Sequence, residues 1–224
     1  MRKIVILLML FMLGLTAVSC SSGPDDCSGE GVLFEDDFSG DKDCGWVLYN
    51  RGGTTASIED GGLRISTNQP GQIWWTNPGQ SLDDAVISVE TRQLSGPDNN
   101  AYGLICRYQN ETNFYTFLIS GDGYYAIGKY QSGSDQITYL SGVDATDPTD
   151  DGGYVFSEAI KQGVETNQLR ASCIGNELSF AVNGIPLETV TDPTFVTGDI
   201  GLGVSTLEQG TAVIEFNNLR VLAP

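Results

Sequence analysis

AYGLICRYQNETNFYTFLISGDGYYAIGKY, residues 101–130, contains the clearest signature of the fold class. Three runs rich in Tyr, Phe, Ile and Leu (101–109, 114–120 and 124–130) are separated by short polar clusters. Such runs bounded by Gly, Asn, Asp and Ser are typical of β-strands. The cluster Ser120-Gly121-Asp122-Gly123 has the composition of a tight hairpin turn. The stretch therefore predicts three consecutive antiparallel strands.

The same alternation of apolar runs and short polar clusters continues in both directions, from residue 32 to the C-terminus. Asp60-Gly61-Gly62 and Asn183-Gly184 each join two apolar runs, as hairpin turns do. One short stretch, residues 157–164, favours a helix. We therefore expect an all-β, antiparallel β-sandwich of a dozen or more strands. Further strands are expected at 32–38, 46–49, 55–58, 63–67, 72–76, 85–93, 137–140, 168–174, 178–182, 189–190, 200–205 and 212–222.

The N-terminus has the pattern of an export signal. Arg2 and Lys3 precede an apolar run from Ile4 to Leu15. At about 1.5 Å per residue this run spans roughly 18 Å, which is too short for a hydrocarbon core of about 30 Å. The length is typical of the apolar region of a signal peptide.

The cleavage region, Ala17-Val18-Ser19-Cys20, resembles the lipobox of bacterial lipoproteins. It departs from the usual motif in having Ala17 rather than Leu three residues before the cysteine. The resemblance implies a signal peptide over 1–19, an acylated Cys20 and a flexible tether over 20–31, followed by one domain over 32–224. The alternative is ordinary secretion with Cys20 left as a free thiol. In either case we expect an exported protein. In the first case we expect the protein to be anchored to the membrane through its lipid alone.

Charge and composition exclude several functions. The net charge of −18 becomes −20 once residues 1–19, with two basic and no acidic residues, are removed. Nucleic acid is therefore not an expected partner, because phosphate binding needs a positive surface. The chain has no histidine, which excludes Ser-His-Asp and Cys-His catalysis and histidine-liganded zinc.

Four cysteines remain after Cys20, and an even number in an exported chain favours disulfides. We predict Cys27–Cys44, which are close in sequence, and Cys106–Cys173, which lie in two strand-like runs. The alternative is that these cysteines are buried free thiols.

Several stretches together resemble the concanavalin A-like lectin/glucanase superfamily, and are most similar to its laminin G-like and 3-keto-disaccharide hydrolase-related members. The resemblance implies a jelly roll of two large antiparallel sheets, one of them with a concave face. It covers nearly the whole mature chain and rests on Phe34–Gly40 with Trp46, Gly61–Ile65, Tyr102–Tyr108, Phe114–Phe117, Gly123–Tyr125, Asn167–Arg170, Gly175–Leu178, Val182–Gly184, Gly198–Gly203 and Phe216–Val221.

Catalysis has weak support in the sequence. Glycoside hydrolysis needs two carboxylates that flank the scissile bond. The Glu-x-Asp-x-x-Glu strand of laminarinase-type members is absent, and the strand 85–93 carries only Glu90. By resemblance to the keto-disaccharide hydrolases, Thr116 stands where an acidic residue is expected. We expect no catalytic residue.

Glycan binding needs aromatic faces and a few polar groups that orient hydroxyls. Trp74 and Trp75 are neighbours in one strand and point to opposite faces, so at most one belongs to the core. Because side chains alternate between the two faces of a strand, Ile105 and Arg107 are expected on the same face. The resemblance places Thr116 and Leu118 on that face too, and implies that the face is concave. The expected ligand-binding residues are Arg107, Trp74, Trp75, Tyr125 and Thr116.

A structural Ca²⁺ is expected from the resemblance, because related sandwiches often hold one where the first and last strands meet. Asp37, Asn217 and Asn218 are the candidate ligands here, together with backbone carbonyls, since Ca²⁺ takes six to eight oxygens.

The sequence thus predicts a non-catalytic β-sandwich that binds a carbohydrate or another cell-envelope glycan at the cell surface. Two alternatives remain open. One is a structural or protein-interaction module of the cell envelope, and the other is a divergent glycoside or 3-keto-disaccharide hydrolase that uses Glu90.

Overall fold

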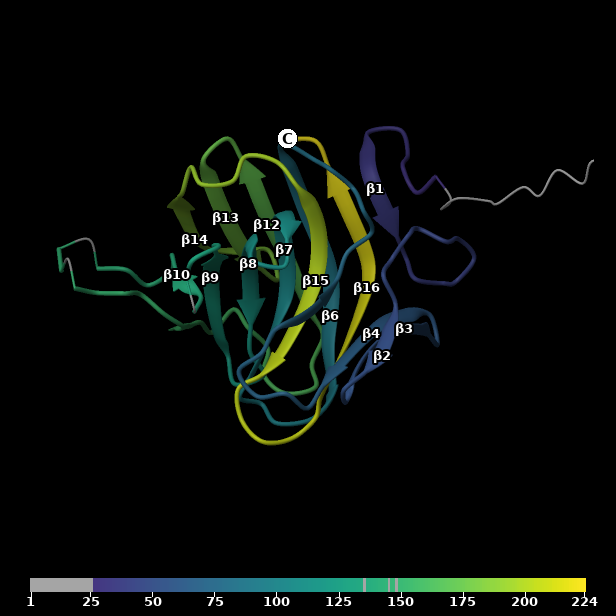
Figure 1. The fold of residues 1–224 in the computed structure, drawn as a ribbon, viewed down its shortest axis with the longest axis horizontal. Coiled ribbons are helices and arrows are strands. Elements are labelled where there is room, and N and C mark those ends of the chain that lie inside the picture. Colours follow the sequence, from purple (N-terminus) through teal and green to yellow (C-terminus); the bar gives the residue numbers. More distant parts are fainter. Residues whose placement is uncertain (1–25, 135, 145, 148) are drawn as a thin grey trace, which may run out of the picture.

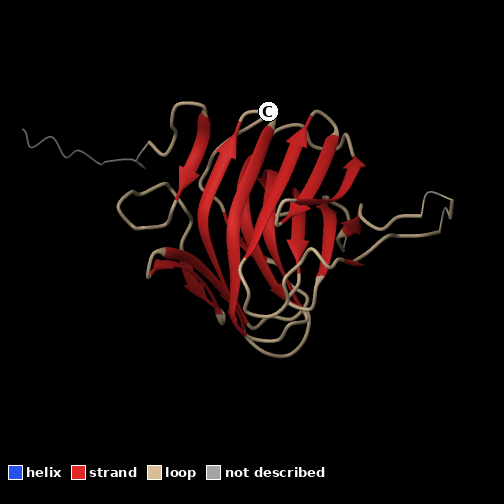
Figure 2. Ribbon diagram, turned by 180° about the vertical axis from the view of Figure 1, so that it is seen from behind, coloured by secondary structure: helices blue, strands red, loops and turns tan. Residues whose placement is uncertain are grey.

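The computed structural model of the protein describes residues 26–224 except 135, 145 and 148, and every regular element in that part is a β-strand (Figures 1 and 2). The strands form two antiparallel sheets, so the predicted all-β antiparallel sandwich is confirmed. None of the described residues lies in a helix long and apolar enough to cross a membrane. The predicted signal peptide and Cys20 lie outside the described residues.

Sheet A contains nine strands in the described part of the chain. Its order is β14 (Ile185–Thr191), β13 (Glu177–Val182), β12 (Asn167–Ile174), β6 (Ala85–Ser95), β16 (Ala212–Leu222), β4 (Gly62–Thr67), β3 (Thr54–Glu59) and β2 (Tyr49–Arg51), with β1 (Val32–Asp36) paired to β16.

Sheet B contains seven strands among the described residues. Its order is β10 (Thr138–Tyr139), β9 (Tyr124–Tyr130), β8 (Asn113–Ile119), β7 (Asn100–Asn110), β15 (Asp199–Thr206) and β5 (Trp74–Thr76), with β11 (Val155–Phe156) paired to β9. The predicted hairpin stretch 101–130 supplies β7, β8 and β9. The stretch 157–164, which favoured a helix, forms turns instead.

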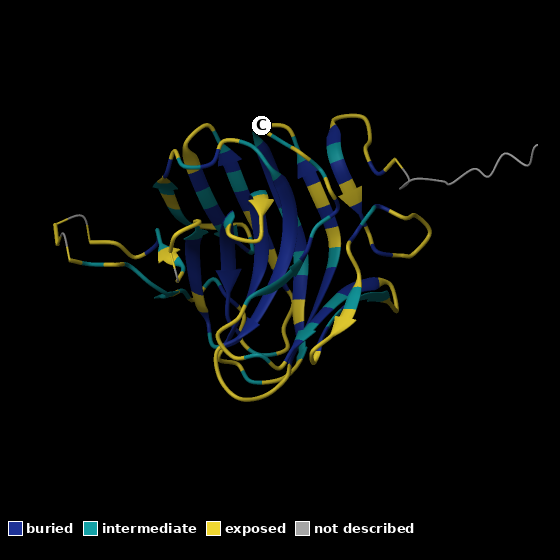
Figure 3. Ribbon diagram, in the orientation of Figure 1, coloured by how far each residue is buried: buried dark blue, intermediate teal, exposed yellow. Residues whose placement is uncertain are grey.

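The two sheets differ in how their outer faces are covered (Figure 3). In sheet A burial alternates along the strands, as in β12, where Leu169 and Ala171 are buried and Arg170 is exposed. Sheet B is buried on both faces along β15 and along most of β7 and β8. One face packs on sheet A, and the loops cover the other.

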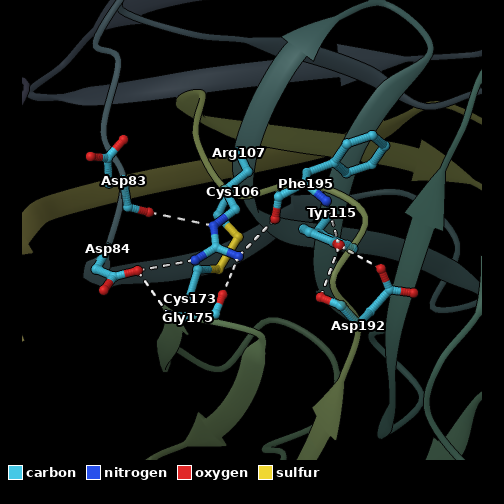
Figure 4. Close-up of a disulfide and its surroundings, with 9 residues drawn as sticks. All are labelled: Asp83, Asp84, Cys106, Arg107, Tyr115, Cys173, Gly175, Asp192 and Phe195. Atoms are coloured by element: carbon cyan, nitrogen blue, oxygen red, sulfur yellow. Dashed lines mark hydrogen bonds and ion pairs between the residues drawn. A yellow bond between two sulfur atoms is a disulfide. The ribbon is translucent and has the colours of Figure 1, made fainter.

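Both predicted disulfides are present. Cys27–Cys44 ties the chain that precedes β1 to the loop that follows it. Cys27 is itself buried, so the ordered fold begins within the predicted tether over 20–31. Cys106–Cys173 joins β7 of sheet B to β12 of sheet A through the core (Figure 4).

A buried ion pair also crosses between the sheets, near their edges at β9 and β14. Lys129 Nζ lies 2.6 Å from Asp192 Oδ2, and Tyr115 Oη donates a hydrogen bond of 2.6 Å to Asp192 Oδ1. Burial alone would raise the pKa of Asp192, but hydrogen bonds from Lys129, Thr194 and Tyr115 outweigh it and lower the pKa to about 2. The segment after β14 is thereby fixed against sheet B.

This pair predicts an acid-dependent stability. The folded pKa of Asp192 lies below its ordinary value of 3.8, so its stabilisation is complete above about pH 4 and disappears as the pH falls toward 2. Asp192→Asn is expected to lower the free energy of unfolding at pH 7 by about 2 kcal/mol, and the difference from the wild type should shrink between pH 4 and 2. Urea titrations at several pH values measure this difference. Asp151→Asn, at an exposed position, is the control. A difference in unfolding free energy between Asp192→Asn and the wild type that stayed constant down to about pH 2 would contradict the lowered pKa of Asp192.

Candidate functional site

The two tryptophans lie on β5, the edge strand of sheet B, and both are half-buried. Trp74 is opposite Val204, whose side chain is in the core, and Trp75 is opposite Gly203. Trp74 therefore points toward the side of sheet A, and Trp75 points toward the outer face of sheet B. Neither tryptophan is wholly core, because the strand ends the sheet and leaves part of each ring accessible.

Trp75 belongs to an aromatic group on the outer face. Its ring centroid lies 5.9 Å from that of Tyr108 and 5.4 Å from that of Phe114. Phe114 stacks in turn on Tyr130 at 4.7 Å. A hydrogen bond from Trp75 to Tyr108 opposes the burial that raises the pKa of Tyr108, and burial prevails. The Trp75 ring is thus fixed in orientation, as a stacking platform must be.

Trp74 faces a second aromatic residue that comes from the other sheet. Its ring lies 6.1 Å from that of Tyr49 on β2, the edge strand of sheet A. The guanidinium of Arg51 lies over both rings, 5.3 Å from the Tyr49 centroid and 5.7 Å from the Trp74 centroid. Gly52 and Gly53, with φ of 62° and 83°, make the tight turn that returns the chain to β3 directly after Arg51.

Both tryptophans line one cleft of about 450 Å³, where the edges of the two sheets meet. This volume is within the range of small-ligand sites. Aromatic rings line the cleft together with amide, guanidinium and carboxylate groups. The lining residues are Val47, Tyr49, Arg51, Gln72, Ile73, Trp74, Trp75, Asn77, Tyr108 and Glu111.

Asp199 fixes the loop that forms one end of this cleft. Its carboxylate accepts hydrogen bonds from the Asn77 side chain and from the backbone N–H groups of Gly79 and Gln80, the latter two at 2.7 Å. Burial raises the pKa of Asp199, although these hydrogen bonds oppose the rise. The position of Asn77 in the cleft is therefore held by the sheet itself.

Two polar atoms of the cleft residues have no partner. Tyr49 Oη and Trp74 Nε1 are buried, and neither makes a hydrogen bond within the described part of the chain. Burial raises the pKa of Tyr49 to about 12, against the opposing charge of Arg51. A buried polar group without a partner costs about 1–3 kcal/mol, so a ligand or water that forms a hydrogen bond with either atom would be stabilised.

Arg107 does not lie in this cleft, contrary to expectation. Its side chain is 2% exposed, and its guanidinium donates to the carbonyls of Gly175 (2.7 Å) and Phe195 (2.8 Å) (Figure 4). It also donates to the Asp83 carbonyl and pairs with Asp84 Oδ1 at 3.2 Å. Arg107 thus holds three loops together, and four of its five N–H groups donate within the protein.

A β-bulge explains why alternation misplaced this residue. Cys106 is opposite Tyr115, but the next pair along β7 and β8 is Asn110 with Asn113. Arg107 has a φ of 52°, in the left-handed region, which turns its side chain away from the face that alternation assigns to it.

The outer face of sheet B at Thr116 is closed as well. Ile105 and Thr116 are 0% exposed. Ile73 packs against Gly203 on the outer face of sheet B. Ile137 packs against Gly128 on the same face. These two isoleucines occupy the space where an open concave groove was expected, so Thr116 lies beneath them.

Tyr125 points the other way. It is buried in the core, packs edge-on against Phe180 of sheet A and donates a 3.0 Å hydrogen bond to Glu188. Of the five expected ligand-binding residues, only Trp74 and Trp75 are therefore brought together in a cleft.

Two of the expected calcium ligands, Asp37 and Asn218, line one cleft of about 450 Å³ where β1 meets β16, whereas Asn217 lines the separate pocket beside Glu90. Asp37 is exposed and caps its own turn by accepting from the Ser39 N–H at 2.9 Å. The Asn218 amide donates to Glu90 and the Asn217 amide points to Glu215. No group of three or more His, Cys, Asp or Glu suited to a metal occurs within the described ranges. Calcium at this place stays a prediction.

Glu90 lies on the outer face of sheet A, beside a small pocket of about 240 Å³. The other carboxylate in that pocket, Glu215, is paired with Arg64 at 2.9 Å and Arg92 at 2.8 Å. Burial would raise the pKa of Glu215, but the two arginines lower it. A general acid of a glycosidase needs a raised pKa, so this pair is not arranged for acid–base catalysis.

Solved structures share this fold at low sequence identity. The carbohydrate-binding module CBM66 from Bacillus subtilis has a TM-score of 0.58 and 16% identity, over 80% of this chain and 96% of that chain. A Bacillus subtilis protein of unknown function with a galectin-like fold has a TM-score of 0.58 and 12% identity, over 87% and 96%. A putative glycosyl hydrolase from Parabacteroides distasonis has a TM-score of 0.51 and 14% identity, over 80% and 99%.

These likenesses define the class of fold, a galectin-like β-sandwich, and at such identities they show the fold alone. No family model and no curated protein matches the sequence.

Eight of the ten lining residues were not selected from the sequence, and four of these have an aromatic or charged side chain: Tyr49, Arg51, Tyr108 and Glu111. Tyr49 and Arg51 come from the opposite sheet, and no local pattern links them to Trp74. Tyr108 follows the bulge in β7, which alternation does not detect.

Proposed function

We propose that this domain is a non-catalytic carbohydrate-binding module of an exported lipoprotein, anchored through Cys20, and that it binds glycan in the edge cleft. The observation that carries the proposal is the pair of aromatic platforms, Trp75 with Tyr108 and Trp74 with Tyr49, in one cleft with polar side chains. Sugar rings present apolar C–H faces that stack on such platforms, while amide and charged groups orient the hydroxyls.

Three further observations support this choice. The buried hydroxyl of Tyr49 and the indole N–H of Trp74 lack partners that a sugar hydroxyl or a water would supply. Carbohydrate-binding and glycosyl hydrolase proteins are among those that share the fold. Glu215, the carboxylate beside Glu90 on sheet A, is neutralised by two arginines, which disfavours a hydrolase.

Trp75→Ala should abolish most of the binding. Removing the platform is expected to raise the Kd for a bound oligosaccharide at least ten-fold, or about 1.4 kcal/mol, because the stacking area disappears. A glycan array identifies the ligand, and isothermal titration of the exported mature protein measures the change in Kd.

Phe156→Ala is the matched control, since Phe156 is an aromatic residue 51% exposed and does not line the cleft. It should leave the Kd unchanged, and thermal melts of both variants check that the fold persists. If no glycan binds above background, or if Trp75→Ala binds as well as the wild type, the proposal is wrong and an interaction with another envelope protein becomes the better explanation.

A further inference from the structure

The aromatic cleft has opposite charges associated with its two platforms. Arg51 lies over the rings of Tyr49 and Trp74. Glu111 lines the same cleft and acts on the other platform, since its charge adds to the burial that raises the pKa of Tyr108. The two halves of the cleft therefore prefer different chemical groups on a ligand.

Arg51 has no carboxylate partner among the residues that the structure describes. Arg64, Arg92, Arg107 and Arg220 each pair with an Asp or Glu within 4 Å. The whole chain has 29 acidic and 11 basic residues, so carboxylates are abundant. An arginine in a cleft that none of them neutralises is available to an anion from outside.

The guanidinium is also held in a defined place. Its contacts with the two rings are cation–π interactions, worth about 0.5–1 kcal/mol at an exposed site. A planar guanidinium binds a carboxylate through two parallel hydrogen bonds. Pre-positioning reduces the side-chain entropy that binding would otherwise cost.

The number of charges on the ligand is limited by the rest of the molecule. The chain has a net charge of −18, which repels a dense polyanion. Glu111 disfavours a second anionic group in its half of the cleft. A ligand with one charged and one uncharged sugar fits both constraints.

We propose that the cleft selects an acidic oligosaccharide in which carboxylate-bearing and neutral sugars alternate, with the carboxylate at Arg51 and the neutral sugar stacked on Trp75. This inference rests on the proposed function and adds the class of glycan to it. Arg51 receives the carboxylate where it already lies, over the Tyr49 and Trp74 rings, so its position need not change on binding.

Isothermal titration of the exported mature protein with three tetrasaccharides tests the proposal. The first alternates glucuronic acid and N-acetylglucosamine, and the second is the same molecule with its carboxylates reduced to alcohols. The third is tetragalacturonate, which is charged on every unit. We expect the first to bind at least ten-fold more tightly than either of the others.

Arg51→Met keeps the apolar stem and removes the charge. It should bring the first two ligands within about two-fold of each other and leave the affinity for the reduced ligand unchanged. Arg170→Met is the matched control, because Arg170 is exposed on β12 in sheet A and also lacks a carboxylate partner in the described part of the chain. It should keep the full preference.

The possible failures are distinguishable. If the reduced ligand binds as tightly as the acidic one, and Trp75→Ala abolishes both, the cleft binds glycans but the acidic selectivity is wrong. If Arg51→Met weakens both ligands equally, Arg51 serves only to pack the aromatic rings, and the proposal is overturned. If no glycan of any class binds, the selectivity and the proposed function are both wrong.

Discussion

Arg107→Ala is expected to lower the free energy of unfolding by about 3–5 kcal/mol, because it removes a buried side chain whose guanidinium makes four hydrogen bonds. The variant leaves the carbonyls of Gly175 and Phe195 without their guanidinium donor, and these hydrogen bonds tie two loops to β7. Asp84 also loses the partner at 3.2 Å that neutralises it. Urea denaturation gives the change from the shift in midpoint.

Arg170→Ala is the control for Arg107→Ala, because an exposed arginine on a strand is usually worth less than about 0.5 kcal/mol. The loss of unfolding free energy for Arg107→Lys should lie between those of Arg170→Ala and Arg107→Ala, since lysine keeps the charge but cannot donate in three directions from a planar guanidinium. If Arg107→Ala lost less than about 1 kcal/mol of unfolding free energy, solvent would replace these hydrogen bonds and the guanidinium would not stabilise the loops.

Removal of the disulfide between the two sheets should have a comparable effect. Cys106 and Cys173 are 67 residues apart, and constraining a loop of this length in the unfolded chain is worth about 4 kcal/mol. Cys106→Ala/Cys173→Ala is therefore expected to lose about 4 kcal/mol, with some further loss because both residues lie in the core.

The second disulfide provides the comparison. Cys27 and Cys44 are 17 residues apart, for which the same reasoning gives about 3 kcal/mol. Denaturant titrations of the two double variants should rank them in this order. If the Cys27–Cys44 variant lost more, the N-terminal segment would contribute to the fold beyond closing a loop.

The sequence predicted the sheets well because most strands follow the ordinary alternation of side chains. In β12, Leu169 and Ala171 point inward and Gln168 and Arg170 point outward, so polarity alone identifies the strand and its faces. The hairpin turns carried the remaining information, because glycines with positive φ occur where the chain reverses, as at Gly123 and Gly184.

The site was predicted less well, and each miss has a physical cause. Arg107 lies within a bulge, which changes the direction of a side chain without changing the composition of the strand. Thr116 is covered by Ile137, which lies directly before β10, and the local pattern that predicted a strand at 137–140 does not specify where that segment lies over the sheet. Trp74 and Trp75 do line one cleft, but Tyr49, the aromatic partner of Trp74, comes from a strand in the other sheet.

The outer strands of the two sheets have a consequence for self-association. An exposed strand edge is a template on which another chain can pair through its backbone. Here β2 and β5 are three residues long, and β10 is two residues long. The longer β14 contains Pro186, which lacks an N–H, and its pairing with β13 is interrupted by a bulge. β1, which pairs only with β16 among the described strands, is five residues long and irregular in register between Val32 and Phe34, and β11 is two residues long. No edge in the described part of the chain thus offers a long, flat row of free backbone groups, and this disfavours templated growth of fibrils by crowded copies of the domain.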